Sequence, residues 1–359
     1  NILHHISHVV NGLNYLPNLN EISFMKGEGN QPYCNYFNDF SKMITLKKIS
    51  FKNNGRIQGD FFDLISLTNL EVLDLPVPSI SGDIQHLKLL TKLKHLSLTY
   101  RIIKGNLNSI ILSLKKLEHF EIRHTKITGD LNLISQQNYQ EFSILSQLKN
   151  IIITSDISKN CYLELANVSF LSNMFNLEII ELRQIHIFGD LSKAISNKLK
   201  LKKLCISIEP AYKLYFNLNS FSSLLKLEHI ELSGSKVKGD IIVFQNLRKL
   251  VFLSLNKTKN IYGNISSLSN NLNLQTIIIS DNSDIYGTLS SISTLIKLQC
   301  LSFSNTKVSG HLYSINQMFS LIHLYLYNCE LIKGDIKELT KLIKLKSVDL
   351  ENCPDVCGS

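Results

Sequence analysis

The chain has 359 residues, of which 44% are hydrophobic and 19% charged, and these are ordinary proportions for a folded globular protein. They exclude an intrinsically disordered chain, and no apolar run approaches the ~18 residues that a membrane helix needs. The net charge is +9, but lysine outnumbers arginine 33 to 5 and recurs along the whole chain. Nucleic-acid binders usually concentrate basic residues on one face. The charge therefore predicts a solvated lysine-rich surface, and no nucleic-acid partner is expected.

The N-terminal residues do not resemble a signal peptide. His4, His5 and His8 stand where such a peptide needs an apolar segment. The seven cysteines are scattered and form no CxxC pair, so neither a disulfide framework nor a cysteine-rich zinc site is predicted. This cysteine usage favours an intracellular, reducing compartment, but the compartment stays open because targeting signals can lie outside these residues.

A six-residue string, L-x-x-(L/I)-x-(L/I/F) with minor variation, recurs fourteen times. It begins at Leu19, Leu46, Leu70, Leu93, Leu117, Leu148, Leu177, Leu201, Leu227, Leu250, Leu274, Leu298, Leu321 and Leu345. Nine of the thirteen spacings are 23 or 24 residues. The alternation of apolar and other residues predicts a strand with one buried face. Repetition at this period predicts that such strands stack in parallel, each coil supported by its neighbours.

A glycine slot lies between successive strings. It is filled by Gly59, Gly82, Gly105, Gly129, Gly189, Gly239, Gly263, Gly287, Gly310 and Gly334. A position that takes glycine so often predicts a positive φ angle or a close approach between coils. The residue that follows is Asp, Asn, Thr or His, which can accept hydrogen bonds from the next turn. Apolar residues then recur every three, as in Ile84, Leu87 and Leu90, and this spacing indicates a 3-10-like segment.

Together these residues follow the pattern L-x-x-L-x-L-x-x-N-x-L-x-G-x-I, which resembles the leucine-rich-repeat family. The glycine-centred form is similar to its plant-type subclass as found in microbial eukaryotes. The resemblance implies an α/β solenoid, a horseshoe with a parallel concave sheet and short strand, 3-10 or irregular convex segments. It covers residues 1–359 as one solenoid of about fourteen repeats.

The chain departs from the family pattern at two places. The proline that usually follows G-x-I is missing, and the asparagine of the ladder position occurs only at Asn54 and Asn282. Thr258, Thr306, Cys329 or Cys353 stand there in other coils and can still hydrogen-bond between coils. Cys329 and Cys353 are predicted neighbours; a disulfide is conceivable, but reduced thiols are favoured.

The repeat is irregular over residues 132–226. Residues 132–147, 156–172 and 209–221 are candidate loops for partner contact, although sequence drift that alters curvature explains them equally well. Both ends look cut inside a repeat, so the chain is expected to be a fragment. Residues beyond it, or neighbouring subunits, would then cap its ends.

The outward positions of the strands form columns on the concave face, and these hold the candidate partner-binding residues. They are His119, Glu121, Arg123, Glu181, Arg183, His229, Glu231, His323, Tyr325 and Tyr327. Tyrosine, arginine and histidine at the centre of a concave surface are typical anchors of protein interfaces. The alternative is that the Glu–Arg pairs only neutralise one another on a solvated sheet.

No catalytic or metal-binding motif is present. GxSxG, P-loop, HExxH and dinucleotide-binding signatures are absent. His95, His119 and His124 fall on adjacent strands, but nothing fixes a ligand geometry, so no metal or other cofactor is expected. The sequence therefore predicts a non-catalytic protein–protein interaction scaffold. Two alternatives stay open: an extracellular receptor-like module for peptide or glycan, and a structural subunit of a large assembly.

Overall fold

The computed structural model describes residues 18–25, 35–52, 57–76, 80–100, 102–131, 147–155, 163, 166–208, 213–234, 236–256, 258 and 260–358. The chain divides into two compact units. The first comprises Asn1–Leu177 and Leu182–His186, and the second Glu178–Glu181 and Ile187–Ser359. The expectation of one continuous solenoid stays a prediction.

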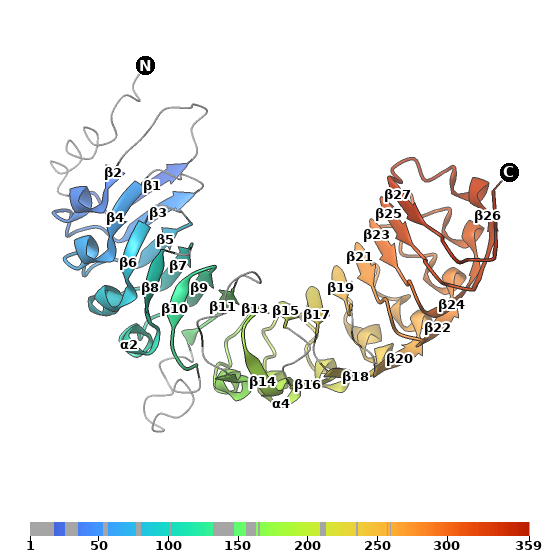
Figure 1. The fold of residues 1–359 in the computed structure, drawn as a ribbon, viewed down its shortest axis with the longest axis horizontal. Helices are drawn as coiled ribbons and strands as arrows, with labels where there is room; N and C mark the ends of the chain where they lie inside the picture. Colours follow the sequence, from blue (N-terminus) through green and yellow to red (C-terminus); the bar gives the residue numbers. More distant parts are fainter. Residues whose placement is uncertain are drawn as a thin grey trace, which may run out of the picture. The chain divides into compact units, whose positions relative to one another are not determined.

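Each of the fourteen strings carries a β-strand that begins two residues after its leucine (Figure 1). In the first unit the strands are β1 (Glu21–Met25), β3 (Lys48–Lys52), β5 (Val72–Leu75), β7 (His95–Thr99), β9 (His119–Arg123) and β11 (Asn150–Thr154), in that order in a parallel sheet. The boundary between the units falls within β13 (Ile179–Arg183). The second unit continues with β15 (Lys203–Ser207), β17 (His229–Ser233), β19 (Phe252–Ser254), β21 (Thr276–Ile278), β23 (Cys300–Ser302), β25 (His323–Tyr325) and β27 (Ser347–Asp349), again parallel.

A second row of short parallel strands passes through the glycine slots. The first unit holds β2 (Asn35–Tyr36), β4 (Ile57–Asp60), β6 (Ile80–Asp83), β8 (Ile103–Asn106), β10 (Lys126–Thr128) and β12 (Ala166–Asn167). The second holds β14 (Ile187–Asp190), β16 (Leu214–Asn217), β18 (Lys236–Asp240), β20 (Asn260–Asn264), β22 (Asp284–Thr288), β24 (Lys307–His311), β26 (Leu331–Asp335) and β28 (Asp355–Cys357). Short strands are thus the form that these segments take in the described residues.

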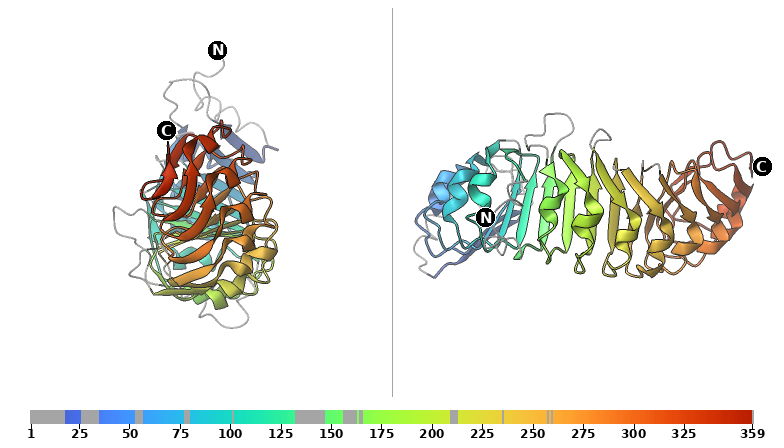
Figure 2. Two further views of the ribbon diagram at one scale, coloured as in Figure 1. Left: turned by 90° about the vertical axis from the view of Figure 1, so that its right-hand side faces the viewer. Right: turned by 90° about the horizontal axis from the view of Figure 1, so that it is seen from below.

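Short helical turns follow the second strands, and Figure 2 shows them as a row along the second unit. Ten of those described are 3-10 turns: η1 (Phe37–Phe40), η2 (Phe61–Leu64), η3 (Ile84–Leu89), η5 (Val168–Leu171), η6 (Leu218–Phe221), η7 (Ile241–Asn246), η8 (Ile265–Leu268), η9 (Leu289–Ile292), η10 (Leu312–Ile315) and η11 (Ile336–Leu339). Two coils instead form an α-helical turn, α2 (Asn108–Ile111) and α4 (Leu191–Ile195). The predicted solenoid of parallel sheets and 3-10 turns is confirmed. None of the helices in the described stretches is long and apolar enough to cross a bilayer.

The strand alternation builds the core. In β9, Phe120 and Ile122 are buried between the partly exposed His119, Glu121 and Arg123. The leucines that open the strings are buried in every coil from Leu46 to Leu321. Because each buried side chain packs on its counterpart in the next coil, stability comes mainly from contacts between neighbouring coils.

All ten slot glycines have a positive φ, from +104° to +155°. At several of these positions, the close approach of the neighbouring coil is a second reason why only glycine fits. At Gly263 (φ +127°) a Cβ atom would meet the Asp240 carboxylate and lie 2.9 Å from Cγ1 of Ile241, both in the preceding coil. Glycine is therefore needed there for its backbone angle and for its missing side chain.

The acidic or amide residue after the glycine caps the helical turn. Asp83 Oδ1 accepts a hydrogen bond from the Gln85 amide at 2.9 Å. The same bond is made by Asp60, Asn106, Asp190, Asp240, Asn264 and Asp335. Asn167 and Asn217 also make it, in coils without a slot glycine. The sequence prediction is thus confirmed for Asp and Asn, but it is wrong for Thr288 and His311, whose side chains make no cap hydrogen bond. The Thr288 hydroxyl contacts Ser290 Oγ at 2.9 Å instead.

Replacing a cap should lower stability modestly. We expect Asp83→Ala to reduce the free energy of unfolding by about 1 kcal/mol, because the Gln85 amide loses its acceptor. Thr288→Ala is the matched control and should cost less, because no cap bond exists there. Urea denaturation of both variants checks this, and equal losses would contradict the assigned role of the Asp83 carboxylate.

The ladder position is buried in the second unit, and the predicted hydrogen bond between coils is confirmed for its two cysteines. The Cys329 thiol donates to the Phe303 carbonyl and the Cys353 thiol to the Leu326 carbonyl, each at 3.1 Å. Thr306 Oγ1 instead donates within its own coil, to the Phe303 carbonyl at 2.6 Å. Neither Cys329 nor Cys353 is in a disulfide. Burial raises the pKa of both thiols. These two cysteines therefore fill the ladder as reduced thiols. Asn54 lies outside the described residues.

A second, outer ladder runs one residue earlier and was not predicted. Asp281, Asn305, Asn328 and Asn352 all have φ between +55° and +63°, a region that Asn and Asp tolerate better than other non-glycine residues. The Asn305 amide donates to Asp281 at 2.7 Å, and the Asn328 amide donates to Asn305 at 3.0 Å. Three successive coils are thus linked on their surface by side chains.

The irregular middle is described in part. Residues 132–146, 156–162, 164–165 and 209–212 lie outside the described residues. Residues 166–171 form β12 and η5, and residues 214–221 form β16 and η6. The described parts of these two candidate loops are therefore strands and 3-10 turns of the regular repeat. They do not form loops that leave the stack.

Candidate functional site

The ten predicted surface residues lie on four strands or directly after one. β9 carries His119, Glu121 and Arg123, and β13 carries Glu181 and Arg183; β17 carries His229 and Glu231, and β25 carries His323 and Tyr325, with Tyr327 two residues further on. The three glutamates occupy equivalent positions in their strands. Their neighbours in the sheet are different residues, because Ile152 lies beside Glu121 and Cys205 beside Glu231. Each glutamate therefore forms its own local cluster.

In the first unit, Glu121 is the centre of a hydrogen-bonded cluster. Its carboxylate accepts from Arg123 Nε through Oε1 and lies 3.1 Å from His119 Nε2 through Oε2. His119 Nδ1 lies 3.0 Å from the Asn150 amide, and its ring stacks on His95 with centroids 4.0 Å apart. The cluster therefore fixes both edges and one face of the His119 ring.

The cluster holds Glu121 in its charged form. Burial alone would raise the pKa of this carboxyl, but hydrogen bonds from His119 and Arg123, with their charges, outweigh it and lower the pKa from 4.5 to about 2. Only 19% of the Glu121 side chain is exposed, so solvent screens these interactions less than it screens surface ion pairs. The predicted anchor residues of β9 are thus already bonded to one another.

Removing this charge should destabilise the first unit. Since the pKa of Glu121 is lowered on folding, its contribution to stability is present above about pH 4.5 and lost as the pH falls through about 2. We expect Glu121→Gln to cost about 1–2 kcal/mol at pH 7 and little at pH 2. Urea denaturation at both pH values measures this. Glu351→Gln, at an exposed position, is the control, and a pH-independent loss for Glu121→Gln would contradict the assignment.

The second unit has a comparable cluster on β15 and β17. Lys203 Nζ lies 2.9 Å from Glu181 Oε2, whose side chain is only 7% exposed. His229 Nε2 lies 3.8 Å from Glu231 Oε2, and its ring stacks on Phe252 with centroids 4.1 Å apart. Cys205 is buried and is the register partner of Glu231.

Sequence reasoning missed several members of these clusters. His95, Lys203, Cys205 and Phe252 were not among the candidate surface residues. All four stand at outward strand positions, so reading every coil at those positions would have found them.

An aromatic cluster marks the C-terminal part of the second unit. The rings of His323 and Tyr325 lie nearly parallel, at 13°, with centroids 6.1 Å apart. The Tyr325 hydroxyl lies 3.4 Å from His323 Nδ1. Ser302 and Asp349 flank Tyr325 in the sheet. Because both neighbours are smaller than tyrosine, they leave the partly exposed Tyr325 ring open to contact.

The lysines pair with acidic residues of adjacent coils. Lys94 Nζ lies 2.6 Å from Glu71, Lys149 Nζ 2.6 Å from Glu118, and Lys202 Nζ 2.7 Å from Glu178. The hydrogen bond to Glu71 raises the pKa of Lys94, and the bond to Glu178 raises that of Lys202. These pairs neutralise part of the positive charge locally, which agrees with the expectation of a solvated surface rather than a basic face.

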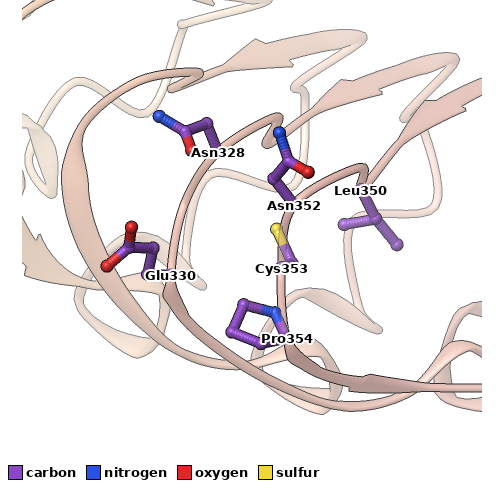
Figure 3. Close-up of a pocket in the computed structure, with 6 residues that line it drawn as sticks. All are labelled: Asn328, Glu330, Leu350, Asn352, Cys353 and Pro354. Carbon is purple, nitrogen blue, oxygen red and sulfur yellow. The ribbon is translucent and has the colours of Figure 1, made fainter.

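A hollow of about 540 Å³ lies at the turns after β25 and β27 (Figure 3). It is lined by Asn328, Glu330, Leu350, Asn352, Cys353 and Pro354. Its thiol, Cys353, has a raised pKa because of burial and donates its proton to a carbonyl. Reactive cysteines have lowered pKa values, so this thiol is not an activated nucleophile.

Comparison with known proteins shows the fold. No family model and no curated protein matches the chain. Among solved structures, it is similar to the plant peptide hormone receptor RGFR1 in complex with RGF2 (18% identity, TM-score 0.62), covering 94% of this chain and 60% of that one. It is similar to the leucine-rich-repeat protein LIC12759 of Leptospira interrogans (18%, TM-score 0.59), covering 97% and 87%. It is also similar to an internalin of Listeria monocytogenes (15%, TM-score 0.54), covering 96% and 94%.

The chain thus has the leucine-rich-repeat fold and spans less than two thirds of the plant receptor RGFR1. This fold is generally a binding and recognition module and typically non-catalytic. At these identities the likeness extends to the fold alone.

Proposed function

We propose that this leucine-rich-repeat solenoid is a non-catalytic interaction module that holds a segment of a partner protein on the outward face of its strands. The backbone amides and carbonyls of those strands are already bonded within the sheets. Recognition must therefore come from the outward side chains, which alternate with the buried ones at each second position.

The observation that carries the proposal is the aromatic cluster of His323 and Tyr325, with Tyr327 two residues further along the chain. Large, rigid aromatic side chains with a polar end supply contact area at a low cost in conformational entropy. Interfaces concentrate their binding energy in a few such residues. The cluster lies on a regular part of the stack, which holds it in place without a partner.

Several structurally similar proteins add support. RGFR1 is a plant peptide hormone receptor solved with RGF2, and HAESA was solved with the peptide hormone IDA. Proteins that share this fold thus include receptors for peptides. We carry over the class of partner, a peptide or protein, and not the ligands themselves.

The test compares two pairs of tyrosines. Tyr325→Ser with Tyr327→Ser alters the strand face, whereas Tyr262→Ser with Tyr286→Ser alters two half-exposed tyrosines of the second row of strands. Each protein is used to capture partners from an extract of its source cells, followed by quantitative mass spectrometry. We expect at least about a tenfold loss of the specific partners for the first pair only.

The proposal would be overturned if the variant with Tyr325→Ser and Tyr327→Ser still captured the partners while the variant with Tyr262→Ser and Tyr286→Ser did not. A charge reversal at Glu121 is a poorer probe, because it would also break the bonds to His119 and Arg123.

A further inference from the structure

We infer that Cys205, His229 and Glu231 form a binding site for a zinc ion on the second unit. Cys205 lies on β15, and His229 and Glu231 lie on the adjacent strand β17 (Figure 1). The thiol, one imidazole nitrogen and one carboxylate oxygen all lie within 4.8 Å of one another. No other group of three such ligands occurs in the part of the chain that the structure describes.

The distances suit tetrahedral coordination after a small closure. Zinc–ligand bonds of about 2.0–2.3 Å place tetrahedral ligand atoms roughly 3.3–3.6 Å apart. His229 Nε2 and Glu231 Oε2 are 3.8 Å apart, close to that value. The sulfur lies no more than 4.8 Å from either atom, so a shift of about 1 Å brings it into this range.

His229 is held ready for a ligand role. Its Nε2 atom is buried and has no hydrogen-bond partner among the described residues, a state that normally costs free energy. The ring is fixed by its stack on Phe252, with only 2° between the planes. A metal ion bound at Nε2 would satisfy this atom, and a fixed ring orientation favours metal binding.

The ammonium of Lys203, the lysine beside His229 in the sheet, is paired with a different carboxylate. Lys203 is the register partner of His229, but its ammonium lies 2.9 Å from Glu181. Its charge is thus placed against another carboxylate.

The ligand set selects the ion. One thiolate, one imidazole and one carboxylate suit Zn²⁺, whereas Mg²⁺ and Ca²⁺ require oxygen ligands. The side chains of His229 and Glu231 are 30% and 22% exposed, whereas Cys205 is fully buried beneath them, so an ion would enter from the strand face as these two side chains move apart. Three protein ligands leave the fourth position open to water.

The experiment titrates Zn²⁺ into the full chain by calorimetry. The background protein carries His4→Ala, His5→Ala and His8→Ala, because three histidines within eight residues could bind zinc themselves. We expect one saturable site. Cys205→Ser and Glu231→Gln should each weaken binding by at least about 100-fold, the upper end of what loss of a supporting residue costs.

Cys300→Ser is the matched control, since Cys300 is another cysteine on the strand face, on β23, and should leave the affinity unchanged. Co²⁺ in place of Zn²⁺ gives a second readout. A thiolate-to-metal absorption band should appear in the background protein and in Cys300→Ser, and disappear in Cys205→Ser. Circular dichroism of each variant confirms folding.

Absence of saturable binding, or unchanged binding in both Cys205→Ser and Glu231→Gln, would overturn the proposal. If Cys205→Ser failed to fold, Glu231→Gln alone decides, because it keeps the thiol and the size of the side chain.

Discussion

Gly263→Ala is expected to lower the free energy of unfolding by about 3–5 kcal/mol. The backbone at this position has φ +127°, a conformation that costs a non-glycine residue about 1–3 kcal/mol. The added Cβ would also press on the Asp240 carboxylate and on Ile241 of the preceding coil. Overpacking of this kind typically costs a further 1–3 kcal/mol or so. Urea denaturation measures the total.

Two matched variants separate these contributions. Gly310 has a similar φ of +118°, but its Cβ would meet only the backbone nitrogen of Leu289 at 3.2 Å and carbons beyond 3.5 Å. Gly310→Ala should therefore show mainly the cost of the backbone angle and a smaller loss. In the double variant Asp240→Ala with Gly263→Ala, the second substitution should cost less than it does alone. Equal losses at Gly263 and Gly310, with no such relief, would contradict the proposed contact between coils.

Lys198→Met is expected to raise the free energy of unfolding by about 2–3 kcal/mol at pH 7. Lys198 is fully buried, and its ammonium donates to Asn197 Oδ1 at 3.0 Å. The equivalent position of other coils carries Leu224, Leu247 or Leu295. Burial of this ammonium disfavours its charged form and lowers its pKa to about 8, a shift that corresponds to about 3 kcal/mol at pH 7, and an apolar residue of similar size avoids this cost.

The gain in the free energy of unfolding from Lys198→Met should depend on pH. Burial lowers the pKa of Lys198 from 10.5 to about 8. Between about pH 8 and pH 10.5, Lys198 binds more protons in the unfolded chain than in the folded chain. The free energy of unfolding of the wild-type protein therefore rises as the pH rises through this range. The advantage of Lys198→Met should shrink over that range. Lys226→Met, at an exposed lysine, is the control, and a pH-independent gain for Lys198→Met would contradict this origin.

The repeat made most of the fold predictable. A strand begins two residues after each of the fourteen leucines because apolar alternation and a constant period both specify it. Asp83 and its equivalents were predicted as caps because a carboxylate after the slot has one obvious backbone donor within reach. Because the same local pattern of residues recurs in many repeats, few other secondary structures are compatible with the sequence.

The site was less predictable because it depends on differences between coils. Lys198 occupies a place where the three-residue spacing requires an apolar side chain, and that exception was overlooked. Cys205 was read as one of several scattered cysteines, although it stands at the position equivalent to Glu231 in the preceding coil and pairs with it between β15 and β17. The outer ladder of Asp281, Asn305 and Asn328 depends on left-handed backbone angles, which sequence periodicity does not report. In β9, Glu121 forms hydrogen bonds with residues of its own strand. These bonds depend on side-chain rotamers, which the sequence does not specify.

The direction of the hydrogen bonds between coils has a mechanical consequence. In the second unit the Lys346 amide donates to Ile322 and the Ile322 amide to Gln299, each at 2.8 Å and each reaching one coil back. These bonds lie along the direction in which the coils stack. Tension along that direction therefore loads the bonds at an end coil first and peels coils away singly, rather than shearing a whole sheet at once. A released coil of 23 or 24 residues extends to about 80 Å, so a stretched unit would lengthen in equal steps and yield gradually, with no single breaking point.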